Sequence, residues 1–289
     1  MQNNTRAKRL YVSFGENCLP DGILKRYGLK SFSTPFSSAR SNIEYVLELE
    51  KSQYRDFLNP DYLADQEISG RPVVRLTKGV ETVNRYDPLH ANGFEFSHHD
   101  VLRDAHAREA FVRRYRRLQH FDGEHLTILY HHRPCGETDW SMLLGHMQEL
   151  RALYLQRGAQ QVDVAVFTQV FVDDAALRKV NRYSLDHVHV YVFRTLQPWS
   201  GDNPELLWAR VDEDLLSVMM YDVFKGFKGK QAAKPERDAF VPLQYASIAL
   251  KDKRLALSSR GPSPKGKGLK RIFRRLKSLL RKVKKHFKP

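Results

Sequence analysis

The sequence predicts an α/β fold with a mainly parallel sheet and flanking helices, in a Rossmann-like three-layer arrangement. Three short runs, 126–130, 162–167 and 188–193, are continuous and rich in Val, Ile and Leu, as strands buried on both faces are. Stretches with apolar residues at helical spacing alternate with the strand-like runs. Such alternation is typical of parallel sheets whose strands are joined by helices.

The other elements follow in order along the chain. Three further runs are expected to form strands: 10–14, 73–76 and 94–96. Five stretches are expected to form helices, two of them with a proline in the first turn: from Pro20, 41–58, 102–121, 140–156 and from Pro204. Residues 60–92 show neither the helical nor the strand period of apolar residues, and we expect an excursion or a β-hairpin there.

Length and cysteine content restrict the class of protein. The 289 residues are enough for one large domain or two small ones, and the chain has two cysteines, Cys18 and Cys135. Two cysteines do not make a disulfide scaffold and suit a reducing cytoplasm. The N-terminus has no apolar signal segment, and no run of about 18 apolar residues occurs. The sequence therefore predicts a cytoplasmic protein without a membrane span.

The net charge of +15 is concentrated at the C-terminus. Residues 265–289 contain twelve Lys or Arg and no acid, which leaves +3 for the rest of the chain. We expect an α/β domain over 8–225, a flexible linker with scattered Gly, Lys and Pro over 226–268, and a basic amphipathic helix over 269–287.

The predicted C-terminal helix combines its cations with one apolar stripe, whose members recur every three or four residues: Leu269, Ile272, Phe273, Leu276, Leu279, Leu280, Val283 and Phe287. An anionic membrane surface binds both features, whereas a nucleic acid needs only the cations. The sequence thus predicts peripheral attachment to the inner membrane through 269–287. The nearly balanced charge of the remaining chain argues against a nucleic acid as partner.

Cys18 is the most informative single residue. An apolar run ends at Gly15, a tight turn follows, and a helix is expected to begin near Pro20. This order places Cys18 at the carboxyl end of a strand, where α/β sheets bind ligands. A helix N-terminus favours a thiolate, so the position suits a nucleophile, and a buried structural cysteine is the alternative.

Five segments of the sequence resemble the same known family: 12–18 (VSFGENC), 24–30 (LKRYGLK), 33–36 (STPF), 96–100 (FSHHD) and 113–118 (RRYRRL). They are similar to the DUF1796 family, bacterial proteins described as papain-like cysteine peptidases. The last two segments resemble the family's histidine block and arginine-rich helix. We expect the resemblance to extend discontinuously over roughly residues 10–220. It implies a cysteine-dependent hydrolase.

Two features depart from this resemblance. The family tends to continue Pro-Phe with Asp-Trp, whereas Ser37 and Ser38 follow Phe36 here. Papain-like enzymes usually have no strand directly before their cysteine, whereas a strand is predicted directly before Cys18. That order is closer to SGNH hydrolases, whose nucleophile follows the first strand of a parallel sheet.

Polar residues follow the predicted strands at five places. If these strands are parallel, their carboxyl ends meet along one edge of the sheet and form a crevice for a ligand. The ligand-binding residues expected there are Gly15, Asn17, His131, His132, Gln169 and Arg194. The resemblance also pairs Cys18 with a base, His98 or His99, which would take the thiol proton. Asn17 or the Cys18 N–H is the expected oxyanion donor.

No metal and no cofactor are expected. Several side chains could ligate a metal, but none has the spacing of a known metal motif: His98, His99, His131, His132, Cys135, His187 and His189. The glycine-rich motifs of phosphate and dinucleotide loops are also missing. The arginine run 113–117 either faces solvent or binds an anion such as a phosphate or a nucleotide sugar.

These observations predict a cysteine-dependent hydrolase or acyl transferase, similar to papain-like peptidases, that is attached peripherally to the cytoplasmic membrane. Two alternatives stay open. One is a transferase or sugar-handling enzyme of cell-envelope polysaccharide assembly, in which Cys18 is structural. The other is a non-enzymatic, membrane-associated interaction protein. The sequence does not identify the substrate.

Overall fold

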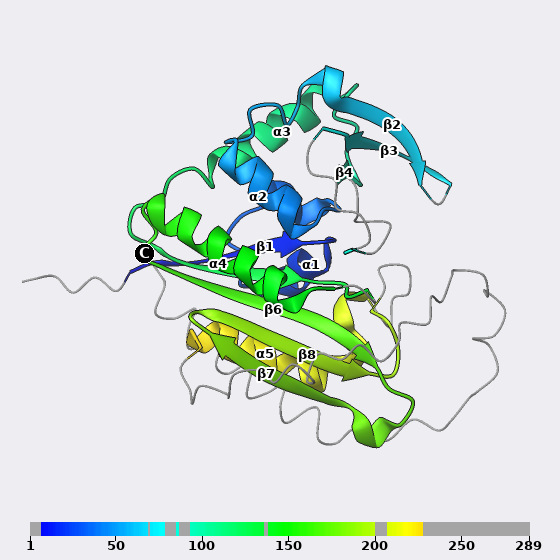
Figure 1. Ribbon diagram of the computed structural model, residues 1–289, viewed down its shortest axis with the longest axis vertical. Coiled ribbons are helices and arrows are strands. Elements are labelled where there is room, and N and C mark those ends of the chain that lie inside the picture. The colour runs from blue at the N-terminus through cyan, green and yellow to red at the C-terminus, as the bar shows by residue number, and fades with distance from the viewer. Residues whose placement is uncertain are drawn as a thin grey trace, which may run out of the picture. The chain divides into compact units, whose positions relative to one another are not determined.

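The central sheet has five strands in the order β1-β5-β6-β8-β7 (Figure 1). The computed structural model describes residues 7–68, 70–78, 85–86, 93–135, 138–199 and 207–227. The strands of this sheet are β1 (Arg9–Gly15), β5 (His125–His131), β6 (Gln161–Phe171), β7 (Lys179–Leu185) and β8 (Val188–Thr195). All are parallel except β7, which pairs antiparallel with β8 at one edge. The predicted mainly parallel α/β sheet is therefore confirmed.

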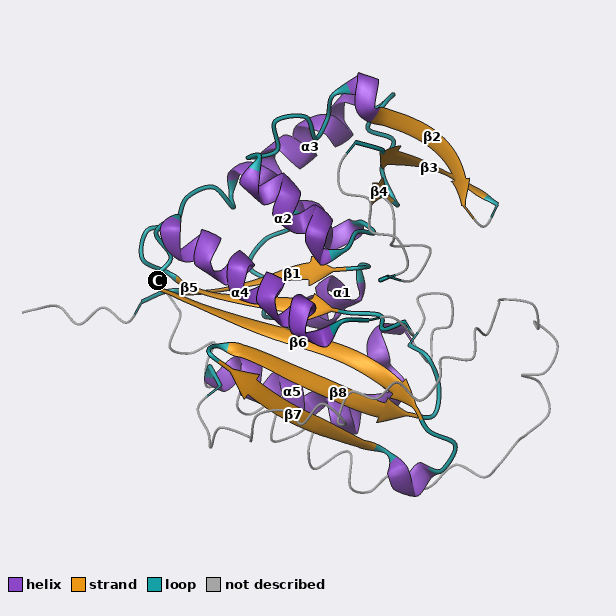
Figure 2. Cartoon of the chain, viewed as in Figure 1, coloured by secondary structure: helices purple, strands orange, loops and turns teal. Residues whose placement is uncertain are grey.

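Helices cover both faces of this sheet (Figure 2). α2 (Ile43–Lys51) and α4 (Trp140–Gln156) pack on one face, and α1 (Leu19–Arg26) and α5 (Glu213–Lys225) on the other. Successive residues of a strand point to opposite faces, so Ile128 joins the core under α4 while Leu129 joins the core under α1 and α5. The sheet and the helices on its two faces form the three layers that the sequence predicts.

A second, antiparallel sheet lies within the excursion between β1 and β5. Its strands are β2 (Leu63–Ile68), β3 (Arg71–Leu76) and β4 (Phe94–Phe96). The hairpin that 60–92 predicted is present as β2 and β3. The predicted strand 94–96 is present as β4, but it pairs antiparallel with β3 and does not belong to the parallel sheet.

Two of the helices that were predicted, α2 and α3 (Ala105–Arg116), begin at side-chain caps and end at turns. In α2 the Asn42 side chain accepts from Tyr45 N at 3.0 Å, and in α3 the Asp104 side chain accepts from His106 N at 2.8 Å. Both helices are shorter than the predicted ranges 41–58 and 102–121. α2 ends where Gln53 and Tyr54 take φ values of 52° and 62°, which no right-handed helix continues.

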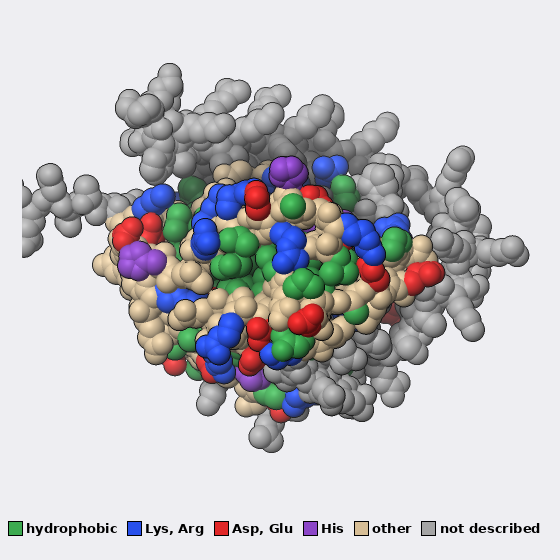
Figure 3. Space-filling model, turned by 90° about the horizontal axis from the view of Figure 1, so that it is seen from above, with side chains coloured by type: hydrophobic (Ala, Val, Ile, Leu, Met, Phe, Trp, Pro, Cys, Tyr) green, Lys and Arg blue, Asp and Glu red, His purple; other side chains and the backbone are tan. Residues whose placement is uncertain are grey.

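Basic and acidic side chains are interspersed on the face seen in Figure 3, with apolar side chains between them. This mixture fits the charge of +3 that residues 1–264 carry. The predicted helix over 269–287, and the linker from 228 onward, lie outside the described residues. Within the described ranges, no helix is both long and apolar enough to cross a membrane.

Candidate functional site

The end of β1 lies directly against the end of β5. Gly15 is paired with His131, and Glu16 N donates to His131 O at 3.2 Å. Gly15 has φ +133°, and a Cβ on it would lie 2.7 Å from His131 N and 2.8 Å from His131 O. Only glycine permits this approach, which brings the turn after β1 beside the histidines of β5.

We expect Gly15→Ala to destabilise the protein by about 2–5 kcal/mol, because backbone strain and overlap with His131 add together. Gly28→Ala is the matched control, since Gly28 also has positive φ (+68°) but no atom within 4 Å of the added Cβ. Only backbone strain acts at Gly28, so we expect Gly28→Ala to destabilise the protein by about 1 kcal/mol. Urea unfolding measures both. Equal losses would show that the contact with His131 is not tight.

Asn17 fixes the tautomer of His131. Asn17 Oδ1 accepts from Leu19 N at 3.1 Å, so this atom is the carbonyl oxygen of the amide. His131 Nδ1 lies 3.1 Å from the same oxygen and therefore donates its proton to it. His131 Nε2 is left without a proton, and it makes no hydrogen bond to any described residue. The ring is thus oriented as a proton acceptor.

The surroundings of His131 keep it uncharged. The residue is 5% exposed, and its ring stacks on Phe167 with centroids 4.8 Å apart. Burial, with smaller contributions from the charges of Arg133 and His132, lowers the pKa of His131 well below 6.5. His131 is therefore neutral and able to accept a proton throughout the neutral pH range.

Cys18 is the residue before α1, at the carboxyl end of β1. The helix N-terminus was expected to favour a thiolate, but burial outweighs it and raises the pKa of Cys18 above 9.0. The charge of Asp21 adds to this rise, and the charge of Arg40 opposes it. The resting sulfur is therefore a thiol, and it needs a base to react at neutral pH.

The next histidine, His132, is paired with Glu16, as His131 is paired with Asn17. Glu16 is fully buried, and its two oxygens accept from His132 Nδ1 at 2.6 Å and from Arg133 N at 2.7 Å. Thr138 Oγ1 lies 3.4 Å from His132 Nε2 and 3.8 Å from Cys135 Sγ. Glu16 was not among the predicted site residues. Its place in the turn between Gly15 and Asn17, opposite two histidines, was the available signal.

The predicted bases, His98 and His99, lie just after β4, the last strand of the second sheet. His98 is exposed just after β4, and His99 is half-buried with Nε2 3.3 Å from Ser38 Oγ. Burial and the charge of Arg114 lower the pKa of His99 below 6.5. Among the described residues, no hydrogen bond joins Cys18 to either ring. That His98 or His99 serves as the base stays a prediction.

The two serines that replace Asp-Trp have separate contacts. Ser37 shares a hydrogen bond of 2.9 Å with Ser13, whose hydroxyl lies 2.9 Å from Asp21 Oδ1 in the first turn of α1. Ser38 Oγ accepts from Arg114 at 3.1 Å. The serines therefore connect β1 and α1 with α3, and no carboxylate stands at either position.

The remaining predicted ligand-binding residues belong to β6 and β8 rather than to loops. Gln169 Nε2 donates to Thr195 Oγ1 at 2.8 Å, and Gln169 Oε1 accepts from Trp199 N at 3.0 Å. Arg194 pairs with Val170 of β6 and Lys179 of β7. The structure therefore brings Gly15, Asn17, His131 and His132 together, and places Gln169 and Arg194 on the neighbouring strand pair. Across the described ranges, no group of three or more His, Cys, Asp or Glu side chains is arranged to hold a metal.

Comparison with known proteins identifies one family. A family model with the description "Putative papain-like cysteine peptidase (DUF1796)" matches residues 9–156. This range runs from β1 through α4 and contains both cysteines, whereas the expected resemblance extended to residue 220. No curated protein and no solved structure matches the chain. Because the family model covers more than half of the sequence, the chain belongs to the DUF1796 family, whose description is that of a cysteine hydrolase.

Proposed function

We propose that the protein is a cysteine-dependent hydrolase or acyl transferase in which Cys18 is the nucleophile and His131 its general base. The observation that carries this proposal is the hydrogen bond of 3.1 Å from His131 Nδ1 to Asn17 Oδ1. This bond holds the ring of His131 beside Asn17, the residue that precedes Cys18, and leaves its Nε2 without a proton. A cysteine, a histidine and an amide that orients the ring are the groups used by papain-like peptidases.

The reaction needs no external reactant except substrate and water. His131 Nε2 takes the Cys18 proton while Sγ attacks the acyl carbonyl carbon, and the carbonyl oxygen becomes an oxyanion. The leaving group takes the proton from His131 as its bond to carbon breaks, which leaves a thioester on Cys18. Water then gives a proton to His131 and attacks the thioester, and Cys18 departs as a thiol. An amine or alcohol in place of water makes the reaction an acyl transfer.

The electrostatics favour this route over a preformed ion pair. The pKa of Cys18 is raised and that of His131 is lowered, so both groups are uncharged at rest. Charge develops only when the substrate is bound. The amides at the start of α1, the Cys18 N–H among them, then lie at the position where an oxyanion gains from the helix N-terminus.

A trapping experiment tests the nucleophile. The protein is incubated with a panel of p-nitrophenyl esters and aminoacyl thioesters, and peptide mass spectrometry locates the acyl group. We expect acylation at Cys18 with release of the leaving group, loss of both in Cys18→Ala, and retention of both in the matched control Cys135→Ala. Acylation at Cys135, or undiminished turnover by Cys18→Ala, would overturn the proposal.

The basic C-terminal segment would attach the enzyme to the inner membrane surface. Residues 265–289 hold twelve cations and no acid, and the apolar stripe of 269–287 supplies the part that inserts. We expect deletion of 262–289 to release the protein from vesicles that contain anionic lipid, while its melting temperature stays nearly unchanged. Flotation assays measure the first result.

A charge-preserving variant separates lipid insertion from simple attraction. Replacing Phe273, Leu276 and Leu280 by Ser keeps every cation, so weaker vesicle binding would come from the lost apolar face alone. If this variant binds as well as the parent, or if the deletion variant stays bound, membrane attachment through this segment is wrong.

A further inference from the structure

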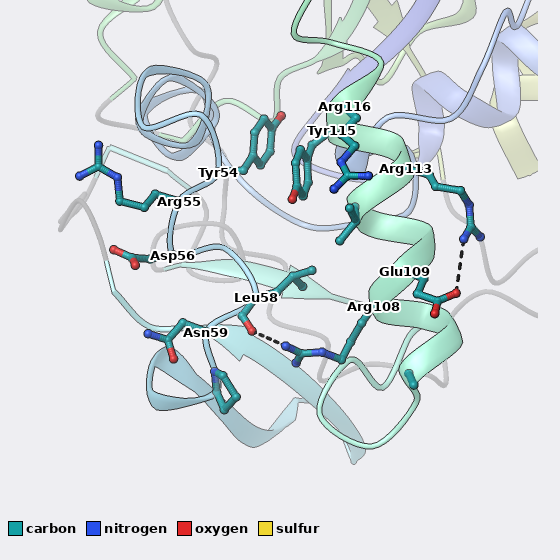
Figure 4. A pocket seen from close by; sticks show the side chains of 13 residues that line it. Tyr54, Arg55, Asp56, Leu58, Asn59, Arg108, Glu109, Arg113, Tyr115 and Arg116 are labelled. Carbon is teal, nitrogen blue, oxygen red and sulfur yellow. Dashed lines mark hydrogen bonds and ion pairs between the residues drawn. The ribbon is translucent and has the colours of Figure 1, made fainter.

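A cavity of about 830 Å³ lies between the segment 54–60 and α3 (Figure 4). This volume falls within the range of small-molecule sites in proteins. One wall is a single face of α3, formed by residues three or four apart: Glu109, Val112, Arg113 and Arg116. None of the described residues that line the cavity takes part in the proposed chemistry of Cys18.

Positive charge exceeds negative charge in this cavity. Four arginines line it, Arg55, Arg108, Arg113 and Arg116, against the two acids Asp56 and Glu109. The Asp56 carboxylate is already held by Lys78 at 2.7 Å, and Glu109 and Arg113 are exposed side chains 3.7 Å apart. In the described part of the chain, no carboxylate pairs with Arg55, Arg108 or Arg116.

Arg108 is the best-positioned of these cations. Its guanidinium donates to Leu58 O at 2.8 Å and to Val101 O at 3.0 Å, and Figure 4 shows it reaching across the cavity from α3 to Leu58. Carbonyl groups are neutral, so these bonds orient the guanidinium without cancelling its charge. A half-buried cation without a counter-ion is costly, and an anionic ligand would remove that cost.

We infer that this cavity binds a small phosphate ester. Guanidinium groups form paired, charge-assisted hydrogen bonds with phosphoryl oxygens. Tyr115 stacks on Tyr54 with centroids 4.9 Å apart and planes 12° apart, which gives a flat wall for the organic part of the ligand. Arg116 extends beside Tyr115 in Figure 4, so a cation and an aromatic ring are available to the two parts of one molecule.

Calorimetric titration of the full-length chain with inorganic pyrophosphate tests the site at about 0.15 M salt, where distant charges are screened. Arg116→Gln is expected to raise the Kd about tenfold. Arg117→Gln is the matched control, because Arg117 is the exposed cation directly after α3 and does not line the cavity. Its guanidinium lies over the Phe32 ring, 6.0 Å from the centroid. The Kd of Arg117→Gln is expected to change less than about twofold.

The basic residues 265–289 also attract pyrophosphate, so the difference between the two variants decides the outcome. Equal Kd values for both variants, or no binding by the parent chain, would overturn the inference. Melting curves check that each variant is folded. If Arg116→Gln does not fold, Arg108→Gln replaces it, with the same expected loss of affinity, because the Arg108 guanidinium reaches across the cavity in Figure 4.

Discussion

Replacing His131 by alanine is expected to slow the acylation of Cys18 at pH 7 by about a hundredfold or more. A positioned general base contributes roughly that much, and the raised pKa of Cys18 leaves almost no thiolate without one. Stopped-flow release of p-nitrophenol from an activated ester measures the rate. Asn17→Ala should give a smaller loss, because the ring of His131 remains but its Nδ1 partner is gone.

The pH dependence identifies the base more sharply than the size of the loss. Since burial lowers the pKa of His131 well below 6.5, the wild-type rate should persist down to pH values at which an ordinary histidine is protonated. In His131→Ala the rate should be small at pH 7 and rise as the pH approaches the raised pKa of Cys18, because the thiolate then forms without a base.

His99→Ala is the matched control for this experiment, because His99 also has a lowered pKa and is the base that the family resemblance suggested. We expect it to keep most of the rate. If His99→Ala loses the rate and His131→Ala keeps it, the predicted assignment to the histidine block is right and the proposed base is wrong. If both keep the rate, Cys18 is not activated by either ring.

The parallel sheet could be predicted because its inner strands carry an unambiguous signal. The runs 126–130, 162–167 and 188–193 are buried on both faces, and each is apolar except for one residue: Thr127, Asp163 and His189. No strand range was predicted for β2, which fell within the expected excursion or hairpin, or for β7, because both carry polar residues such as Asp65, Gln66 and Arg182. Their side chains are largely exposed or only half-buried, so the apolar pattern of a buried strand is missing.

The candidate site could be predicted only in part, for a similar reason. The polar residues at the ends of β1 and β5 were recognisable, but that these strands are neighbours was not, since residues 16–124 separate them. The pairing of Asn17 with His131, and of Glu16 with His132, depends on this adjacency. The histidine block at 98–99 instead follows a strand of the second sheet, which strand-end reasoning alone could not distinguish.

Removing Arg157 is expected to destabilise the fold more than any surface change. Glu50 is a fully buried residue of α2, and its carboxylate pairs with Arg157 and accepts from Tyr54 at 2.5 Å and from Tyr154 at 2.7 Å. Arg157→Ala leaves that carboxylate without a counter-charge, so a loss of about 3–5 kcal/mol is expected from urea unfolding at pH 7.5. Lys51→Ala is the control, since the pair of Lys51 with Glu149 is exposed and contributes about 1 kcal/mol at most.

The pH dependence shows whether the charge of Glu50 causes this loss. Burial raises the pKa of Glu50 above 4.5 even though Arg157 opposes the rise, so the folded protein holds a proton that the unfolded chain releases. Stability from this group therefore falls as the pH rises above 4.5, and without Arg157 it falls further. The deficit of Arg157→Ala should consequently shrink between pH 7.5 and pH 5, while that of Lys51→Ala stays small. A deficit that does not change with pH would instead assign the loss to the packing of the Arg157 side chain over Tyr154, whose ring centroid is 5.3 Å away.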